Sequence, residues 1–240
     1  MFLNAAMSAA LDRIAERAAD ARRAFTPGAL PLHDDVATAS AASDFTLDPL
    51  VVSAPARAYF ITRNERSEVS YTRDGAFSLS DGRLLDQRGN EVCGFRTASD
   101  VPSALHADPV DAALGRIGDP RIEPDGSLVY SRLTIDPRTG ATDAQRIVVG
   151  RIALALFPPG SKIDSSDAIE ASAPRDVPPH VGTAKDGTFG AIAPMQRDRS
   201  RIDIERSLTR LKDAYLAFDA LRAAETAKAH LGKTAVDLVK

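Results

Sequence analysis

The chain has 240 residues, of which 44% are hydrophobic and 26% are charged, and its formal net charge is −3. This length can bury a sizeable core in one or two domains, and this composition excludes a wholly disordered or collagen-like chain. The small net charge gives no reason to expect a polyanionic partner. Lys and Arg near both ends alternate with acidic residues, which favours solvated helix faces over nucleic-acid binding.

The N-terminal stretch lacks both a basic region and a continuous apolar core, and Asp12 follows early. It therefore does not resemble a cleavable signal peptide. No run of about eighteen apolar residues is available for a membrane span. If the protein leaves the cytoplasm, we expect another route to carry it.

A helix is predicted from Phe2 to Phe25, because this stretch has no Pro or Gly and its apolar residues recur at steps of three and four. Thr26-Pro27-Gly28 ends it, since proline disfavours helix in the preceding residue. Residues 29–46 are small and polar without a sustained period, which predicts a linker or extended arm. The apolar stripe of the helix consists of Leu3, Met7, Ala10, Ile14, Ala18, Ala21 and Phe25.

From Leu47 onward, short runs rich in Val, Ile, Phe, Tyr and Thr predict β-strands. In the stretch YTRDGAFSLSDGRLLDQRGNEVCGF, residues 71–95, glycines recur every seven residues. Asp-Gly pairs favour tight turns because Gly readily adopts a positive φ. The pattern predicts a tightly wound antiparallel meander. The glycines expected to form its turns and the next hairpin are Gly75, Gly82, Gly89 and Gly126.

The most apolar run, residues 146–157, predicts a further strand that ends at Pro158. Residues 160–195 are rich in Gly, Pro, Ser and Asp and predict an irregular return arm. A second long helix is predicted from Ile202 to Lys240, with Gly232 as a place where it could break. Its apolar stripe consists of Leu208, Leu211, Tyr215, Phe218, Leu221, Ala224, Ala227 and Leu231.

These elements predict an α+β fold, in which a mainly antiparallel β domain, meander-like or sandwich-like, is flanked by N- and C-terminal helices. We expect a helical module of residues 1–28 and 196–240, arms at 29–46 and 160–195, and a β domain at 47–159. Isolated helices are marginal in water, so the two helices are expected to pair as a coiled-coil-like module.

Two arrangements of the helices stay open from the sequence alone. They could cover the sheet of a single α+β globule, or they could form a module that also packs against neighbouring copies. In the second arrangement the assembly interface would consist of Leu3, Met7, Ile14, Leu208, Leu211, Tyr215, Phe218 and Leu221.

No constellation typical of an enzyme or a cofactor site is found. Cys93 is the only cysteine, which excludes an intramolecular disulfide, and its apolar neighbours predict a buried residue. The four histidines are scattered; His33 stands beside Asp34 and Asp35, where a solvated turn is favoured over a metal site. A pair of catalytic carboxylates stays open, because their separation in space decides their chemistry. We therefore expect no enzymatic activity, no cofactor and no metal.

Several strings resemble, in the same order, those of the bacterial flagellar axial proteins of the rod and hook group. Residues 71–95 carry the clearest resemblance, and LDPLVV with AYFIT, and VGRIALALFPPGSKI, are similar to two further family motifs. TPG after the first helix, and FGAI with DRSRID before the last, resemble the motifs that border the helices in this family. The chain departs from the family pattern, where asparagines are usual, at Asp20, Arg23, Phe25 and Arg201.

The resemblance implies a structural subunit of the flagellar basal-body rod, exported by the type III apparatus without a cleaved signal. It implies that the partners are other rod or hook subunits and the export apparatus, with neither nucleic-acid binding nor membrane insertion. The terminal helices would pack into the inner tube of a helical assembly that spans the periplasm, with the β domain outside.

Two alternatives accompany this interpretation. A hook-type axial subunit would share the motifs, although a single compact β region suits the rod proteins better. A monomeric β-sandwich binding or adhesin module would use the helices only as cover, but the chain has no Trp and few Tyr for an aromatic binding surface.

Overall fold

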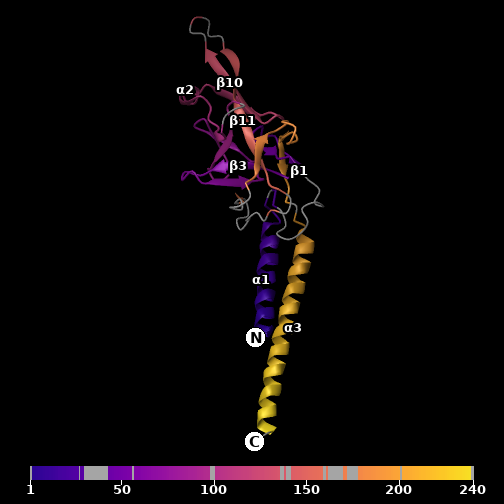
Figure 1. Ribbon diagram of the computed structural model, residues 1–240. Coiled ribbons are helices and arrows are strands. Elements are labelled where there is room, and N and C mark those ends of the chain that lie inside the picture. Colours follow the sequence, from indigo (N-terminus) through magenta and orange to yellow (C-terminus); the bar gives the residue numbers. More distant parts are fainter. Residues whose placement is uncertain are drawn as a thin grey trace. The chain divides into compact units, whose positions relative to one another are not determined.

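The chain folds into two compact units in a computed structural model. The helical unit contains helices α1 (Phe2–Arg23) and α3 (Ile204–Leu238), and the β unit contains all the strands and the short helix α2 (Pro109–Ala113) (Figure 1). The structure describes residues 2–26, 28–29, 43–55, 57–97, 101–135, 138, 142–158, 161, 170–171, 178–200 and 202–238, and among these the side chains of all but 2–4, 170–171 and 232–238.

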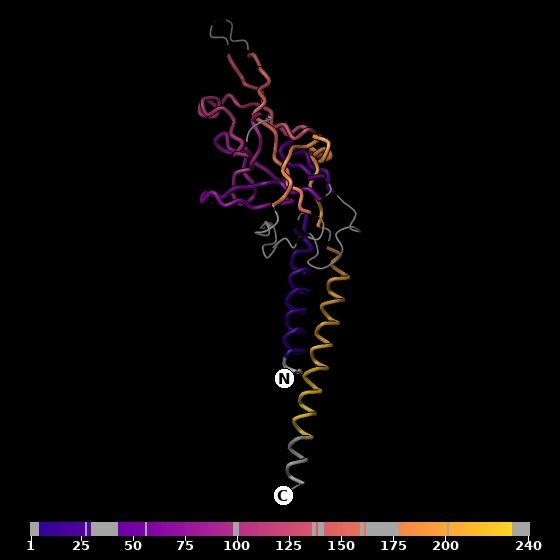
Figure 2. Tube along the Cα trace, viewed as in Figure 1, coloured from indigo at the N-terminus to yellow at the C-terminus, as the bar shows by residue number. Residues whose placement is uncertain are grey.

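In the helical unit, α1 and α3 run antiparallel and lie side by side (Figure 2). Asp203 caps α3, since its side chain accepts a hydrogen bond from the backbone N–H of Arg206 at 3.1 Å. The helix then continues unbroken to Leu238, so Gly232, where a break was possible, does not interrupt it. One glycine costs only about 1 kcal/mol in a helix of this length.

The β unit contains fifteen described strands, most of them short. They are β1 (Ser43–Phe45), β2 (Val52–Ser53), β3 (Ala58–Arg63), β4 (Val69–Thr72), β5 (Ser78–Ser80), β6 (Arg83–Leu85), β7 (Glu91–Phe95), β8 (Ser103–Ala104), β9 (Ile117–Ile122), β10 (Ser127–Ile135), β11 (Thr142–Leu156), β12 (Glu170–Ala171), β13 (His180–Thr183), β14 (Ala193–Pro194) and β15 (Gln196–Asp198).

Eleven of these strands form one antiparallel, nearly closed sheet, in the order β12-β4-β3-β11-β7-β6-β5 along its main path. The long strand β11 also pairs with β10 and β13. The predicted meander is therefore found in part: β5, β6 and β7 are consecutive neighbours, but among the described strands β4 pairs with β3 and β12 and not with β5. β7 pairs with β3 and also with β11, which comes from far along the chain. Local turn signals cannot indicate such long-range pairing.

Two strand pairs stand apart from the large sheet, β1 with β15 and β14 with β2. They bring the beginning of the β unit against its end. The expected irregular arm at 160–195 thus contains strands, of which β13 pairs with Ala153–Leu156 of β11. Pairing with a buried strand overrides the loop-like composition of this segment.

Glycines Gly82, Gly89 and Gly126 have φ angles of 76°, 83° and 81° and lie in turns between consecutive strands. Asp81 also has a positive φ of 50°, so Asp81-Gly82 forms the type I′ turn that joins β5 to β6. Gly75 is not in this left-handed region. It is required for space instead, because a Cβ there would overlap the carbonyl group of Val52.

The core of the β unit is formed by apolar side chains that point inward from β2, β3, β6, β7, β9, β10 and β11. Phe60 and Phe77 meet edge to face at its centre, with ring centroids 5.1 Å apart. Cys93 is also buried, as expected. The largest fully buried side chains are Tyr130, Phe60, Leu84, Leu105, Ile122, Leu128, Ile152, Leu154 and Ile192.

Candidate assembly site

Helix α3 carries two different apolar faces. One face is shielded and consists of positions that repeat at alternating steps of three and four residues: Ile204, Ser207, Leu211, Ala214, Phe218, Leu221 and Glu225. Since α1 is the element that lies along α3 in the helical unit, we assign this face to the pairing with α1. Of the predicted interface residues, Leu211, Phe218 and Leu221 belong to it.

The other face of α3 points to solvent. Leu208 and Tyr215 are each 51% exposed, and they lie seven residues apart. Leu216 beside Tyr215 is exposed as well. The predicted stripe thus divides into a shielded half and an exposed half, because Ser207 and Ala214 take the shielded positions that Leu208 and Tyr215 were expected to occupy.

Helix α1 shows a narrower shielded stripe along its first half, which includes Met7, Ala10 and Ile14. Ala10 and Ile14 are buried, while Met7 is half-buried. Leu11, on another face, is exposed. The side chain of Leu3, also expected at the interface, lies outside the described residues.

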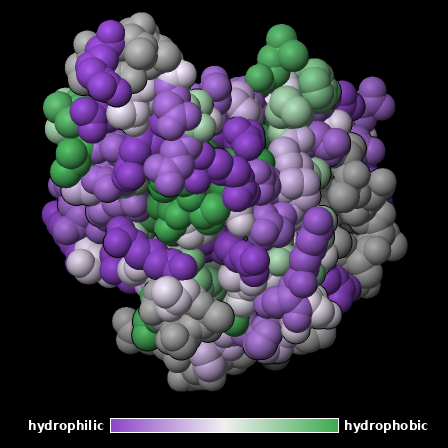
Figure 3. All heavy atoms as spheres, turned by 90° about the horizontal axis from the view of Figure 1, so that it is seen from above, coloured by the Kyte–Doolittle hydropathy of each residue, from purple (hydrophilic) through white to green (hydrophobic). Residues whose placement is uncertain are grey.

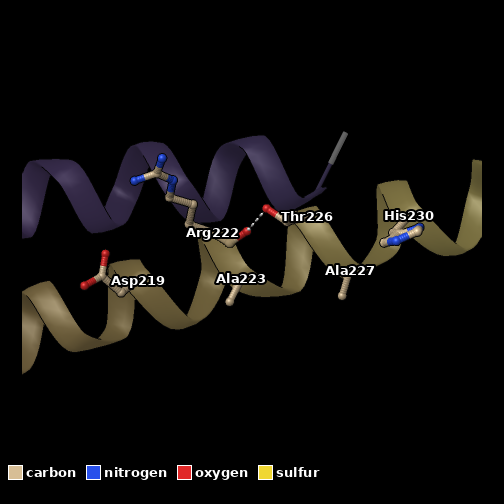
Figure 4. Close-up of a pocket in the computed structure, with 6 residues that line it drawn as sticks. All are labelled: Asp219, Arg222, Ala223, Thr226, Ala227 and His230. Atoms are coloured by element: carbon tan, nitrogen blue, oxygen red, sulfur yellow. Dashed lines mark hydrogen bonds between the residues drawn. The ribbon is translucent and has the colours of Figure 1, made fainter.

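Beyond the start of α1, α3 continues alone. With about 1.5 Å of rise per residue, its 35 residues are some 20 Å longer than the 22 residues of α1. A shallow groove of about 480 Å³ lies along α3 at the N-terminal end of α1, partly beside α1 and partly beyond it (Figure 4). It is lined by Asp219, Arg222, Ala223, Thr226, Ala227 and His230. The small side chains leave room along the helix, and Leu231 beyond them is exposed.

The departures from the family pattern fall in different environments. Asp20 and Arg23 are buried at the end of α1, and Asp20 forms an ion pair with Arg17 at 3.7 Å. The hydroxyl of Ser200 donates a hydrogen bond to the backbone carbonyl of Arg23 at 3.3 Å, which ties the two helix-flanking segments of the helical unit together. Phe25 is exposed. Arg201 lies outside the described residues.

In the β unit, three motifs that are far apart in the sequence converge on Arg73. Arg73 is buried and forms an ion pair with Asp198 at 2.6 Å. Gly28, with a φ of 68°, packs against the Arg73 side chain so closely that a Cβ would overlap it. The Gly28 N–H also donates to the carbonyl of Arg199 at 3.3 Å. We call this cluster of Gly28, Arg73, Asp198 and Arg199 the junction.

Asp74, expected only to support a turn, also belongs to this region. It is buried, accepts a hydrogen bond from the N–H of Ala76 at 3.1 Å, and pairs with Arg197 at 3.1 Å. Neither ion pair could be predicted from the sequence, because nothing local in the motifs TPG, YTRDG and DRSRID indicates that they meet in space.

A second polar network attaches α2 to β10. Tyr130 donates its hydroxyl hydrogen to Asp111 at 2.5 Å, and Arg132 bonds to both Asp111 and Asp108. Burial alone would raise the pKa of Asp111, but the hydrogen bonds from Tyr130 and Arg132 hold it below its ordinary value. Burial and the bond to Asp111 raise the pKa of Tyr130. Every group here has a structural partner, and the network fixes the short helix.

Within the described residues, no group of three or more His, Cys, Asp or Glu side chains is placed to hold a metal ion. None of the described helices combines the length and hydropathy that a bilayer crossing requires. The segment around His33, Asp34 and Asp35 lies outside the described part of the chain.

These features define a protein with a pair of antiparallel terminal helices and an antiparallel β unit, in which the junction joins the first short segment of the β unit to its end. Comparison with models of known protein families gives no match, and a search of curated proteins finds no relative.

Proposed function

We propose that this chain is a structural subunit of the bacterial flagellar basal-body rod, which polymerises through its terminal helices into the axial structure. The resemblance of residues 71–95 and of the helix-flanking strings to the rod and hook group supports this proposal. The observation that carries it is the exposed apolar face of α3, where Leu208 and Tyr215 point to solvent although Leu211 and Phe218 are shielded.

A helix that only covers its own domain needs one apolar face. A second apolar face stabilises an assembly when another helix packs on it, because the removal of exposed apolar surface from water lowers the free energy. The three-four spacing on α3 suits a coiled-coil-like pairing with α1, and Leu208 and Tyr215 flank that seam. The groove lined by Ala223 and Ala227 offers a further place where a neighbouring helix can approach closely.

This function explains why the terminal helices are long, rich in Ala and weakly buried. A subunit that crosses a narrow export channel unfolded gains by completing its helices only at the growing tip, where neighbours supply the missing apolar surface. The partners are then other rod or hook subunits and, before assembly, the export apparatus. Contacts between unlike surfaces build an open helical assembly rather than a closed ring.

The experiment that tests this function removes the gene in the source bacterium and examines isolated basal bodies by electron microscopy. Loss of the rod, restored by the wild-type gene, is the expected result. Intact basal bodies and normal motility would overturn the proposal. Limited proteolysis of the purified chain adds a second test, since residues 43–199 should resist protease in dilute solution while the helices become protected only after assembly.

A further inference from the structure

The β unit has a groove of about 660 Å³ that plays no part in the helical assembly site. Its walls include residues 147–149 of β11, Tyr130 and Arg132 of β10, Arg96 just beyond β7, and residues 106–109, which lead into α2. The volume lies in the range of roughly 300–1,000 Å³ that is usual for sites which bury a ligand or a few side chains.

One wall of this groove is an open strand edge. Strand β11 pairs with β10 along Thr142–Arg151, but on its other edge it meets β7 only from Arg151 onward. Among the described strands, none pairs with residues 142–150 on that edge. Val148 is half exposed there. Open edges and exposed apolar side chains favour contact with another chain.

The charged side chains of the groove are mostly compensated. Arg132 is held by Asp108 and Asp111, and Arg83 shares the carboxylate of Glu91 with His106. Asp81, at the turn before Arg83, also lines the groove. Among the residues that the structure describes, none forms a hydrogen bond or ion pair with Arg96. Arg96 is therefore the guanidinium that is available to a carboxylate of a partner.

A complementary surface lies on the β1–β15 ribbon of the same unit. Phe45 and Leu47 are 71% and 84% exposed, and the N–H of Thr46 donates to the carbonyl of Met195 at 2.9 Å, which brings the exposed Met195 beside them. Asp48 follows directly and is also exposed. We call Phe45, Leu47, Asp48 and Met195 the ribbon patch. It combines apolar side chains with one acid, as the groove combines the apolar residues 147–149 of β11 with one available Arg.

The two surfaces lie at different ends of the β unit. Figure 1 shows β1 low in this unit and α2 and β10 high in it. In the view from above, hydrophobic side chains form separate groups bordered by hydrophilic ones (Figure 3). Because the ribbon patch and the groove are unlike and separate, one copy can use both at once.

We propose that the ribbon patch of one copy of this chain docks into the β11 groove of a second copy, with Leu47 against Val148 and Asp48 paired with Arg96. Such a contact is heterologous, so it continues from copy to copy and builds an open filament. The surfaces are small, so each contact is weak alone and becomes effective when the terminal helices hold many copies in line. The inference rests on the proposed function only in requiring that copies assemble.

Single-cysteine variants of the full chain test this contact. Leu47→Cys and Val148→Cys change exposed residues, and Cys93 is buried and does not compete. Mixed at high concentration and oxidised, the two variants should give a disulfide-linked dimer with one copy of each. Mass spectrometry of the linked peptides identifies it. A mixture of Leu47→Cys with Val69→Cys, another exposed valine on β4, is the matched control and should stay unlinked.

Charge reversal adds a second readout. Arg96→Glu in the Val148→Cys chain should reduce the linked product about fivefold, as expected for a surface ion pair made repulsive. Asp48→Lys in the Leu47→Cys chain should then restore it. Arg66→Glu, which reverses an exposed charge on the β3–β4 turn, should leave the yield unchanged.

Three outcomes would each overturn the inference. The main product could link position 47 to position 47, the Val69→Cys control could give as much linked product as Val148→Cys, or Arg96→Glu could leave the yield unchanged. If the terminal helices assemble copies into filaments but Leu47 and Val148 never link within them, this contact is wrong while the proposed function stands. If basal bodies form normally without the gene, the proposed function fails whatever the crosslinks show.

Discussion

Arg73 and Asp198, 125 positions apart in the chain, form a buried ion pair with an Nη2–Oδ2 distance of 2.6 Å. Nη1 of Arg73 donates to the carbonyl of Ala58 at 2.6 Å, and the hydroxyl of Ser53 donates to Asp198. Both charged groups are thus compensated and hydrogen-bonded. Such a pair fixes which segments meet even where its net stabilisation is modest.

Removing one partner of this pair should destabilise the β unit strongly. Asp198→Ala leaves the buried guanidinium of Arg73 without its carboxylate, which typically costs about 3–5 kcal/mol of unfolding free energy. Urea denaturation followed by circular dichroism measures the change. Asp44→Ala, which removes an exposed pair with Arg199, is the control and should cost less than about 1 kcal/mol. Equal losses in the two variants would contradict the assigned role of the junction.

The two faces of α3 should respond differently to a charge. Leu211→Asp places a carboxylate on the shielded face and should separate α1 from α3, because the carboxylate loses part of its hydration there without gaining a partner. Tyr215→Asp should leave the helix pair intact and prevent only assembly between copies. Both variants should abolish motility and filament formation, while the β unit keeps its urea midpoint. Helicity of the dilute chain distinguishes them, since Leu211→Asp should lower the marginal helicity that the α1–α3 pair retains before assembly and Tyr215→Asp should not. An assembled, functional flagellum with either change would refute the prediction.

A side chain at Gly82 should strain the β5–β6 turn. Gly82 has a φ of 76°, and a Cβ would come within 3.1 Å of Ala112. Gly82→Val should therefore cost at least about 1–2 kcal/mol, the usual penalty for a left-handed conformation in an L-residue. The same substitution at the exposed strand residue Ser78 should change the unfolding free energy by less than about 0.5 kcal/mol. A fully stable Gly82→Val variant would show that the turn adopts another conformation.

Stability of the β unit should fall in acid. Burial alone would raise the pKa of Asp186, but hydrogen bonds from the N–H groups of Phe189, Thr183 and Thr188 lower it below 3.8. A carboxylate with a lowered pKa in the folded state stabilises it above the unfolded value, and this contribution is lost as pH falls through the folded value. The urea midpoint should thus be flat between pH 7 and about 5 and decline below about 4. The decline should be shallower in Asp186→Asn, and an unchanged slope would contradict this.

Cys93 should report whether the β unit is folded. Burial raises the pKa of its thiol, so neither the thiolate nor access by reagent is available in the native state. Modification by a thiol reagent should be slow in buffer and fast in urea. The concentration of urea at which labelling becomes fast should coincide with unfolding by circular dichroism. Rapid labelling of the native chain would show that the core opens locally.

Features that depend on neighbouring residues could be predicted from the sequence. The dipeptide Asp81-Gly82 predicts the turn between β5 and β6, because the backbone conformation of this turn depends on these two residues. The same holds for the terminal helices, whose apolar periods are long and uninterrupted. The sequence predicts a turn role for Gly75. Its actual role, leaving space for the carbonyl of Val52, could not be predicted, because Val52 lies more than twenty residues away in the chain.

Features that depend on long-range contacts could not be predicted. On α3 the apolar pattern favours Leu208 and Tyr215 for the shielded face, but Ser207 and Ala214, one residue earlier, lie there although they give no hydrophobic signal. Strand β13 has a loop-like composition and exists because it pairs with β11. The ion pair of Arg73 with Asp198 joins segments that no local pattern relates.

The hydrogen bond from Gly28 to Arg199 holds the first short segment of the β unit, residues 26–29, beside the last residue of that unit. In chain order the β unit is inserted between α1 and α3. Its strand connections can therefore be lengthened, shortened or exchanged without altering either helix, provided that Gly28 and Arg199 stay within hydrogen-bonding distance.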